Sequence, residues 1–210
     1  MIAREADITV IDFETTGVVD DLPSEPWQIG MVRFAAGTVD CSRQFESLLK
    51  VGDRPFNPKA PGNHHQLRDE IAAAPTMGEL WPELQDWWLG GPLGAHNVSV
   101  EKNIVCAVAP MHRPGPWLDT LKLARVAYPR LESHALGDLL ERLELMDRTR
   151  ELCPAREPHD ALFDAIGCAV LLERLLGLDG WGGVTVEQLE SVQPEAYHRA
   201  LIERGARPAS

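Results

Sequence analysis

The first third of the chain carries apolar residues with the period of two that a β-strand imposes. Over residues 7–14, Ile8 and Val10 fall on one side, and Ile11 and Phe13 fall on the other. Because both sides are apolar, we expect this strand to lie inside a sheet and not at its edge. Further strands are predicted over 28–34, 44–51, 93–95 and 117–119, with turns at 15–17 and 35–37.

Further along the chain, the apolar positions take the period of a helix. The spacing predicts helices over 76–88, 98–108, 120–127, 135–145, 160–176 and 194–203, with loops at 55–61 and 110–116. The segment 160–176 is the longest and most apolar, so we expect it to pack in the core. Strands first and helices after them predict an α/β fold in which helices flank a central mixed sheet.

The chain of 210 residues is long enough for one substantial domain. A split at 110–116 would leave neither half with a complete sheet, so we expect a single domain over residues 1–176. The glycine-rich stretch LGLDGWGG then opens residues 177–210, which we interpret as a C-terminal extension packed on or appended to the domain.

The charge balance limits the partners that the surface can bind. Twenty Lys and Arg against 32 Asp and Glu give a formal net charge of −12. Such a surface cannot bind long duplex DNA as a broad cation, so any contact with nucleic acid must be local, short or metal-assisted.

The cysteines and the first residues indicate the compartment. Four cysteines, never two residues apart, argue against a zinc ribbon or a disulfide scaffold and fit a reducing cytoplasm. The start MIAREADITVIDFE carries charges where a signal peptide needs apolar residues, and no run approaches eighteen apolar residues. We therefore expect a cytoplasmic protein that has no membrane partner.

Acidic residues on two predicted elements are candidates for chemistry. Asp12 and Glu14 project to the same face of the first strand, at the carboxyl end where open α/β sheets place ligands. Two like charges this close call for a cation, although a strand-end pair can also simply face water. Asp164 lies inside the apolar segment 160–176, where an unpaired carboxylate is costly and needs a partner.

His159 and Glu101 are candidate site residues only in combination with these acids. His159 follows Pro158 at the entry to the late helix and could lean over Asp164, although a lone histidine is more often a simple hydrogen-bonding residue. Glu101, alone, would be a solvated helix residue, and it follows His96 and Asn97, which we expect to tie a strand-to-helix turn. The order DxETTG, AHNxxxE and HxAxxDA makes the combination a strong signal.

This combination resembles the DEDDh group of 3′–5′ exonucleases, which includes proofreading polymerase subunits, ribonuclease T and oligoribonuclease. The resemblance spans about residues 7–176 and implies a ribonuclease H-like fold. It is carried by VIDFETTG at 10–17, AHN at 95–97 with Glu101, and HDALFDA at 159–165. Weaker echoes are QIG at 28–30, His64 with Pro75, LDT at 118–120 and LAR at 123–125.

The resemblance also implies a role for each site residue. Asp12, Glu14 and Asp164, completed by Glu101, would hold two Mg²⁺ or Mn²⁺ ions, and Asp12 would bridge them. Hard divalent ions prefer such oxygen ligands and reverse the charge that would otherwise repel a phosphodiester. His159 would be the general base, so activity should rise with pH through the ordinary histidine pKa near 6.5. The terminal nucleotide would contact Phe13, Thr15, Thr16 and, less directly, His64.

Three positions depart from the family pattern. Glu101 stands where an aspartate is usual, which keeps the charge and adds one methylene that could alter metal spacing or preference. Gln28 stands where many relatives carry an acid, and His65 stands where glycine usually follows the histidine. The last two departures concern the choice of substrate more than activity.

The sequence therefore predicts a metal-dependent 3′–5′ exonuclease that acts on single-stranded DNA or RNA ends or short oligonucleotides and releases nucleoside 5′-monophosphates. One alternative is a catalytically weak DEDDh-like protein that binds nucleic acid or accompanies a polymerase. Another is a phosphodiesterase acting on small nucleotides. A homodimer is possible. Trp81, Trp87 and Trp88 could form a stacking platform, but their spacing within an amphipathic helix favours packing.

Overall fold

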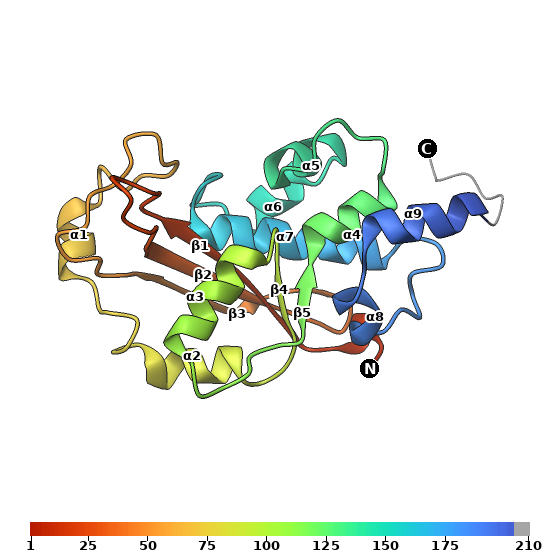
Figure 1. The fold of residues 1–210 in the computed structure, drawn as a ribbon, viewed down its shortest axis with the longest axis horizontal. Helices are drawn as coiled ribbons and strands as arrows, with labels where there is room; N and C mark the ends of the chain where they lie inside the picture. The colour runs from red at the N-terminus through yellow and green to blue at the C-terminus, as the bar shows by residue number, and fades with distance from the viewer. Residues whose placement is uncertain (204–210) are drawn as a thin grey trace.

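A five-stranded mixed sheet forms the centre of the molecule (Figure 1). The structure, a computed structural model, describes residues 1–203, and the side chains of residues 1–199. The strands lie in the order β3-β2-β1-β4-β5, antiparallel across β1–β2 and β2–β3 and parallel across β1–β4 and β4–β5. Their bounds are β1 Ile8–Thr15, β2 Pro26–Ala35, β3 Thr38–Leu48, β4 Leu93–Ala95 and β5 Trp117–Asp119.

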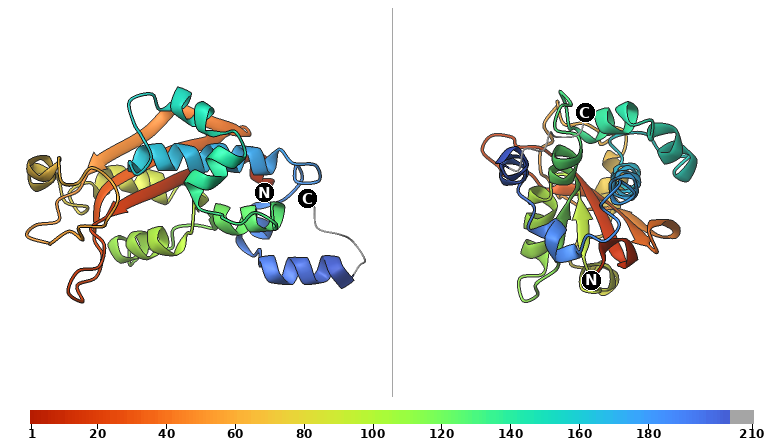
Figure 2. Two further views of the ribbon diagram at one scale, coloured as in Figure 1. Left: turned by 90° about the horizontal axis from the view of Figure 1, so that it is seen from above. Right: turned by 90° about the vertical axis from the view of Figure 1, so that its right-hand side faces the viewer.

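Helices cover both faces of this sheet, which gives the expected layered α/β architecture. The long helix α7 packs against β1, β2 and β3, and Figure 2 shows it on the opposite side of the sheet from α3. The helices are η1 Ala3–Glu5, α1 Arg68–Ala73, α2 Trp81–Trp88, α3 Ser99–Val108, α4 Thr120–Ala127, α5 Leu136–Arg142, α6 Met146–Leu152, α7 Ala161–Leu176, α8 Val186–Glu190 and α9 Pro194–Glu203.

The alternation along β1 divides the core into two parts. Ile8 and Val10 join the apolar cluster that α7 shares, whereas Ile11 and Phe13 join the cluster beneath α2 and α3. Helix α7 contributes thirteen buried residues, so its expected core position is confirmed. Trp88 is fully buried within the cluster beneath α2 and α3, and Trp81 and Trp87 are partly buried against that cluster. The three tryptophans therefore pack against the core and do not form a stacking platform.

Some boundaries differ from the sequence expectation. Strand β3 begins at Thr38 and not at residue 44. Its pairing with β2 continues beyond a register shift at Val32/Arg33, and the apolar alternation in the sequence did not reveal this continuation. The helix expected over 135–145 ends at Arg142, where Glu144 takes a positive φ of 58°, and α6 follows separately. The short helices α1 and α8 were not predicted, because each is too short to show a helical period.

Residues after α7 contact the rest of the domain through the first residues of the chain. The N–H of Ala3 donates to the Val184 carbonyl (2.9 Å), and the N–H of Val186 donates to the Met1 carbonyl (2.9 Å). Val186 and Leu189 belong to the same core cluster as α7. Helix α9 packs along α4, as Figure 1 shows at the right. The domain division at residue 176 stays a prediction.

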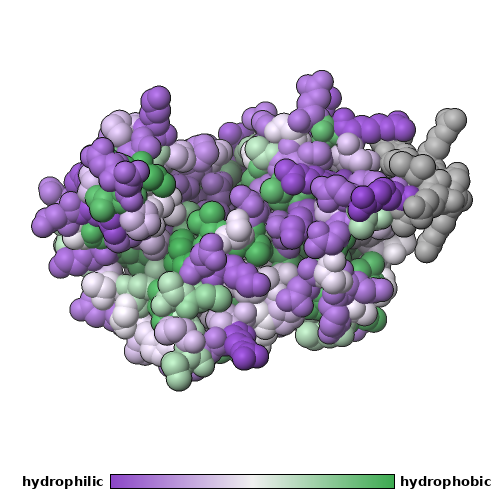
Figure 3. All heavy atoms as spheres, in the orientation of Figure 1, coloured by the Kyte–Doolittle hydropathy of each residue, from purple (hydrophilic) through white to green (hydrophobic). Residues whose placement is uncertain are grey.

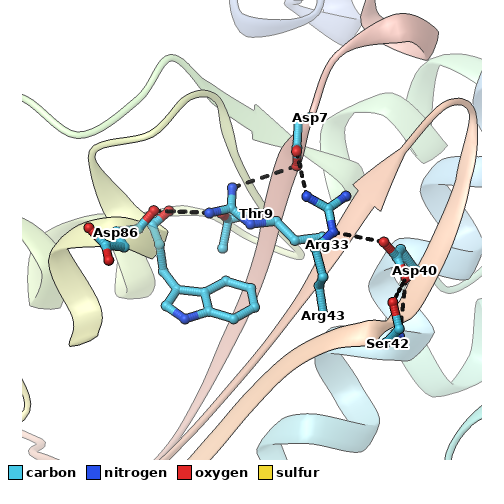
Figure 4. Close-up of polar contacts among 8 residues, drawn as sticks. Asp7, Thr9, Arg33, Asp40, Ser42, Arg43 and Asp86 are labelled. Carbon is cyan, nitrogen blue, oxygen red and sulfur yellow. Dashed lines mark hydrogen bonds and ion pairs between the residues drawn. The ribbon is translucent and has the colours of Figure 1, made fainter.

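A polar network fastens α2 to the start of β1 (Figure 4). The Thr9 hydroxyl donates to the Trp87 carbonyl (2.8 Å), and Arg33 Nη2 donates to the Asp86 carbonyl (2.9 Å). The Arg33 guanidinium also lies over the Trp87 ring, 4.8 Å from its centroid. These contacts hold the end of the sheet that lies away from the carboxyl end of β1.

The surface seen in Figure 3 is largely hydrophilic, in keeping with the acidic composition. Within residues 1–203, the longest helices fall short of the length and apolar character that a bilayer crossing demands.

Candidate active site

The register of β1 and β2 places two acids on the face that α7 covers. Asp12 lies opposite Gly30, and Glu14 lies opposite Gln28. A Cβ atom on Gly30 would sit 2.2 Å from the backbone carbonyl carbon of Ala161, far inside van der Waals contact. The absent side chain therefore allows the start of α7 to lie directly on β2 beside Asp12.

The start of α7 brings a histidine and a third acid to the same point. Ligand atoms of Glu14, His159 and Asp164 all lie within 4.8 Å of one another. His159 itself is exposed and takes a positive φ of 68°, and its backbone N–H donates to Asp164 Oδ2 at 3.2 Å. The backbone thus turns sharply before the helix and presents the histidine ring to Glu14 and Asp164, the place that the sequence anticipated.

Glu101 and Asp12 extend this group without joining the tight set of three. Glu101 lies in the first turn of α3, only 5% exposed, and its Oε2 atom is buried without a hydrogen-bond partner. Asp12 interacts electrostatically with Asp164, Glu101 and Glu14. Asp12 therefore lies near enough to the other three predicted carboxylates for their charges to raise its pKa.

The electrostatics show a cluster that lacks a counter-charge. Burial, followed by repulsion from Asp164 and Asp160, raises the pKa of Glu14 to about 8. Burial is also the main cause that raises the pKa of Glu101 to about 7 and that of Asp164 to about 6. Burial and then Asp164 raise the pKa of Asp12 well above its ordinary value. Among the described side chains, no arginine or lysine forms an ion pair with these four carboxylates.

This donor set fits a hard divalent cation. Such ions take carboxylate oxygens, and the unpartnered Oε2 of Glu101 is a free, buried donor of that type. A bound cation would also favour the charged forms of the four carboxylates, which burial and neighbouring acids disfavour. Glu14, His159 and Asp164 therefore form a group of ligand atoms that could hold a metal ion.

The four residues expected to hold substrate occupy different surroundings. Phe13 is buried on the far face of β1, whereas Thr15 is partly exposed at its end. The Thr16 hydroxyl donates to the Gly17 carbonyl (3.1 Å) and accepts the N–H of Glu25 (3.0 Å), so it holds the loop after β1. Direct contact of these residues with a nucleotide stays a prediction.

His64 is built into an aromatic cluster that the sequence did not reveal. Its ring stacks on Phe56 (4.8 Å between centroids) and meets Trp27 edge-on, and Nδ1 is buried without a partner. Gly62 in the same loop lies against the His159 carbonyl, and an added Cβ there would be 3.0 Å from that oxygen. The loop after β3 therefore forms one wall of the site, and its role in binding substrate stays a prediction.

His96 ties three segments together behind the site. Its Nε2–H donates to the His134 carbonyl (2.8 Å), and its Nδ1 lies 2.9 Å from the Thr120 hydroxyl. Burial lowers the pKa of His96, and the Thr120 hydroxyl also donates to the Ala95 carbonyl (3.2 Å). The backbone N–H of Asn97 is fixed by the Asp119 carboxylate (3.2 Å). This arrangement is structural, as the sequence suggested.

Gln28 and Asp160 are the residues whose importance the sequence understated. Gln28 donates to Asp160 and accepts the N–H of Ala161, so it joins β2 to the start of α7. Asp160 could be found as the helix N-cap that precedes an apolar run. Its partner lies 132 residues earlier in the chain, which no local signal indicates.

The sheet order defines a ribonuclease H-like fold, with acids and a histidine gathered at the carboxyl end of the first strand. The RNase_T family model, described as exonuclease, matches residues 9–172. The chain therefore belongs to this exonuclease family and is a hydrolytic enzyme.

Similarity to individual proteins agrees with the family. The chain is 26% identical over 193 residues to exodeoxyribonuclease 10 of Escherichia coli K12, covering 88% of this chain and 74% of the relative. It is 28% identical to DNA polymerase III PolC-type of Bacillus cereus, over 82% of this chain but 11% of the polymerase.

Solved structures share the fold. Exonuclease X in complex with 5′-overhanging duplex DNA superposes with a TM-score of 0.67 at 25% identity, covering 87% of this chain and 97% of that one. The nuclease domain of 3′hExo, a DEDDh family member bound to rAMP, gives a TM-score of 0.64 at 19% identity, covering 88% and 98%.

Proposed function

We propose that this 3′–5′ exonuclease acts on single-stranded DNA ends and releases nucleoside 5′-monophosphates. The observation that carries the proposal is the convergence of Glu14, His159 and Asp164 within 4.8 Å. Asp12 and the unpartnered Glu101 extend this set, and no arginine or lysine among the described side chains pairs with its carboxylates. Such a site is costly to keep unless it holds a cation against an anionic substrate.

Asp12, Glu14, Glu101 and Asp164 would hold the Mg²⁺ or Mn²⁺ ions, two of them in the full arrangement. Bound metal supplies Lewis-acid stabilisation of the phosphate charge and lowers the pKa of water. His159 is exposed and its ring reaches the acids, so it is placed to take a proton from the attacking water. The water oxygen bonds to phosphorus, the bond from phosphorus to the 3′ oxygen breaks, and that oxygen takes a proton from solvent water to become the new 3′ hydroxyl.

Two observations support DNA and a single strand. Exodeoxyribonuclease 10 and the PolC-type DNA polymerase, which match this chain in sequence, are by name enzymes of DNA. A net charge of −12 leaves few cations to neutralise the phosphates of a long duplex. The backbone around Phe13, Thr15 and Thr16 and, less directly, His64 would contact the last nucleotide, since these residues lie at or beside the end of β1.

The test is hydrolysis of a 5′-labelled single-stranded DNA oligomer, its RNA counterpart and a blunt duplex, with Mg²⁺, with Mn²⁺ and with chelator. We expect a ladder that shortens from the 3′ end, requires metal and is fastest on single-stranded DNA. A faster ladder on RNA would reassign the sugar. No ladder in either metal would overturn the proposal.

A polymerase-associated function is a second candidate, which the 28% identity to part of PolC favours. In that case the chain would act on a primer end only when a polymerase presents it. Faster hydrolysis of a mismatched than of a matched primer end would support proofreading, and equal rates would count against it. Association with a second copy of the chain stays a prediction that sedimentation can test.

A further inference from the structure

The start of α7 is fixed to β2 by two hydrogen bonds of the Gln28 side chain, one to the Asp160 carboxylate and one to the backbone of Ala161. Gln28 Nε2 donates to Asp160 Oδ2 at 2.8 Å, and Gln28 Oε1 accepts the backbone N–H of Ala161 at 3.3 Å. Gln28 is only 4% exposed, so both of its polar groups need partners inside the protein. An amide suits this position because it donates with one atom and accepts with the other.

Asp160 uses its two carboxylate oxygens for different purposes. Oδ1 accepts the N–H groups of Leu162 (3.1 Å) and Phe163 (3.3 Å), so it caps the helix. Oδ2 takes the bond from Gln28, with Arg156 Nη1 further away at 3.6 Å. The residue that starts the helix is therefore also the residue that is anchored to the sheet.

This anchor lies between the residues that must meet at the active site. Gln28 is the cross-strand partner of Glu14, and Asp160 follows His159 directly. His159 holds a positive φ of 68°, a conformation that costs a residue other than glycine energy and persists only where its surroundings enforce it. The bond to Gln28 fixes the next residue and so contributes to that enforcement.

We propose that Gln28 and Asp160 form a positioning pair that sets His159 and Asp164 against Glu14. This inference rests on the proposed function and deepens it, because it gives the buried amide of Gln28 a part in placing the site residues. A carboxylate at position 28 would place its second oxygen against Asp160 Oδ2 and leave both without a proton to share. The identities of residues 28 and 160 are therefore linked.

The linkage predicts that the donor and the acceptor of the hydrogen bond between positions 28 and 160 can be exchanged. In Q28E the new carboxylate faces Asp160, and in D160N two amide donors face each other. In the double variant, the amide nitrogen introduced at position 160 donates to the carboxylate introduced at position 28. The amide oxygen at position 160 still caps the helix, and the number of carboxylates is unchanged. We expect each single variant to lower kcat at least tenfold with KM changed less than threefold, and the double variant to recover most of that loss.

A matched control separates positioning from simple loss of stability. Thr185 caps α8 at a distance from the acids, so T185A should lower the midpoint of thermal unfolding and leave kcat unchanged. Gln28→Met removes both hydrogen bonds without adding charge, and it replaces Q28E if that variant does not fold. We expect Gln28→Met to lower kcat, unlike T185A at an equal loss of stability.

A second readout does not depend on activity. Unfolding midpoints in EDTA for wild type, Q28E, D160N and the double variant form a double-mutant cycle, and positive coupling is expected. Slower amide hydrogen exchange at Ala161 in the double variant than in either single variant would agree. A double variant as poor as the two single effects combined would overturn the pairing. If wild type hydrolyses no nucleic acid, the proposed function fails while the cycle still judges the pair.

Discussion

The two ends of β1 carry acids with opposite surroundings. At its start, Asp7 accepts from Arg43 Nη1 at 2.6 Å and has Arg33 Nη1 at 3.7 Å (Figure 4). At its end, Asp12 and Glu14 interact with other carboxylates and His159 lies beside Glu14, and no arginine or lysine among the described side chains forms an ion pair with either acid. The same residue type on one strand is thus neutralised at one end and left in mutual repulsion at the other.

The difference has a measurable electrostatic counterpart. Hydrogen bonds from Ser42 and then Arg43 lower the pKa of Asp40, next to Asp7 in the network. Burial and neighbouring acids raise the pKa of Glu14 to about 8. Acids with strongly perturbed pKa values cluster at functional sites, which fits the proposed role of Glu14 but not of the paired acids at the start of β1. The following predictions test that distinction, from the largest effect to the smallest.

The largest effect is expected from exchanging one acid at each end. Asp12→Asn should lower the hydrolysis rate roughly 1,000-fold or more, because metal binding is worth several kcal/mol in the transition state. Asp7→Asn, the matched change at the other end of the strand, should leave the rate within about twofold. Initial rates on labelled single-stranded DNA give the comparison. Equal rates for wild type and Asp12→Asn would remove Asp12 from the site.

Removing the histidine should cost less than removing an acid. His159→Ala should lower kcat roughly 100-fold, which is typical for the loss of a general base, while the affinity for Mn²⁺ stays close to that of wild type. The pH profile should become shallower, because the ring no longer titrates. A wild-type profile in the variant would exclude His159 as the base.

The pH dependence of stability should have opposite signs at the two ends. The folded-state pKa values of Glu14, Glu101 and Asp164, about 8, 7 and 6, exceed their ordinary values, so the folded state binds more protons. Without metal, the stability from these groups is full below about pH 4 and is lost as the pH rises towards 8. The pKa of Asp40 is lowered, so its ionised carboxylate stabilises the fold at pH values above its ordinary pKa. This contribution is lost only as the pH falls through the lowered pKa.

Thermal unfolding in EDTA between about pH 5 and 8.5 measures this slope. We expect the midpoint to fall by several degrees over that range, and Mg²⁺ to remove most of the fall. Glu14→Gln should flatten the curve. A midpoint that rises steadily across the whole range in EDTA would contradict the assignment of raised pKa values to the site.

The smallest effect is expected in the ion-pair network. Arg43→Ala removes exposed ion pairs to Asp7 and Asp40, and such pairs contribute about 0.2–1 kcal/mol each. The free energy of unfolding should therefore be lower than that of wild type by a small amount. The difference between the two proteins should shrink in high salt, and kcat should not change. Chemical denaturation at low and high salt measures it. A large loss of activity in Arg43→Ala would show that the ion pairs at the start of β1 are needed for the function of the acids at its end, and would contradict the distinction between the two ends.

Much of the molecule was readable from the sequence because its signals are local. The alternation around Val10, the apolar run of α7 and the turn after Glu14 each express a backbone period or a steric limit within a few residues. The acids and His159 were identified because their spacing resembles a family, and the structure brings them to one end of the sheet. The short helices α1, α6 and α8 escaped because one or two turns carry too little period to detect.

Tertiary structure alone decided how these local pieces meet. The missing side chain of Gly30 lets α7 touch β2, and Gln28 reaches Asp160 across 132 residues of sequence. Pairing also determines that Asp7 meets Arg33 and Arg43 while Asp12 meets no basic side chain that forms an ion pair in the described residues. The residues within a segment determine its apolar period, and hence its secondary structure, and the chemical groups that it carries. Close packing between distant segments determines which charges are neutralised and which remain available to a ligand.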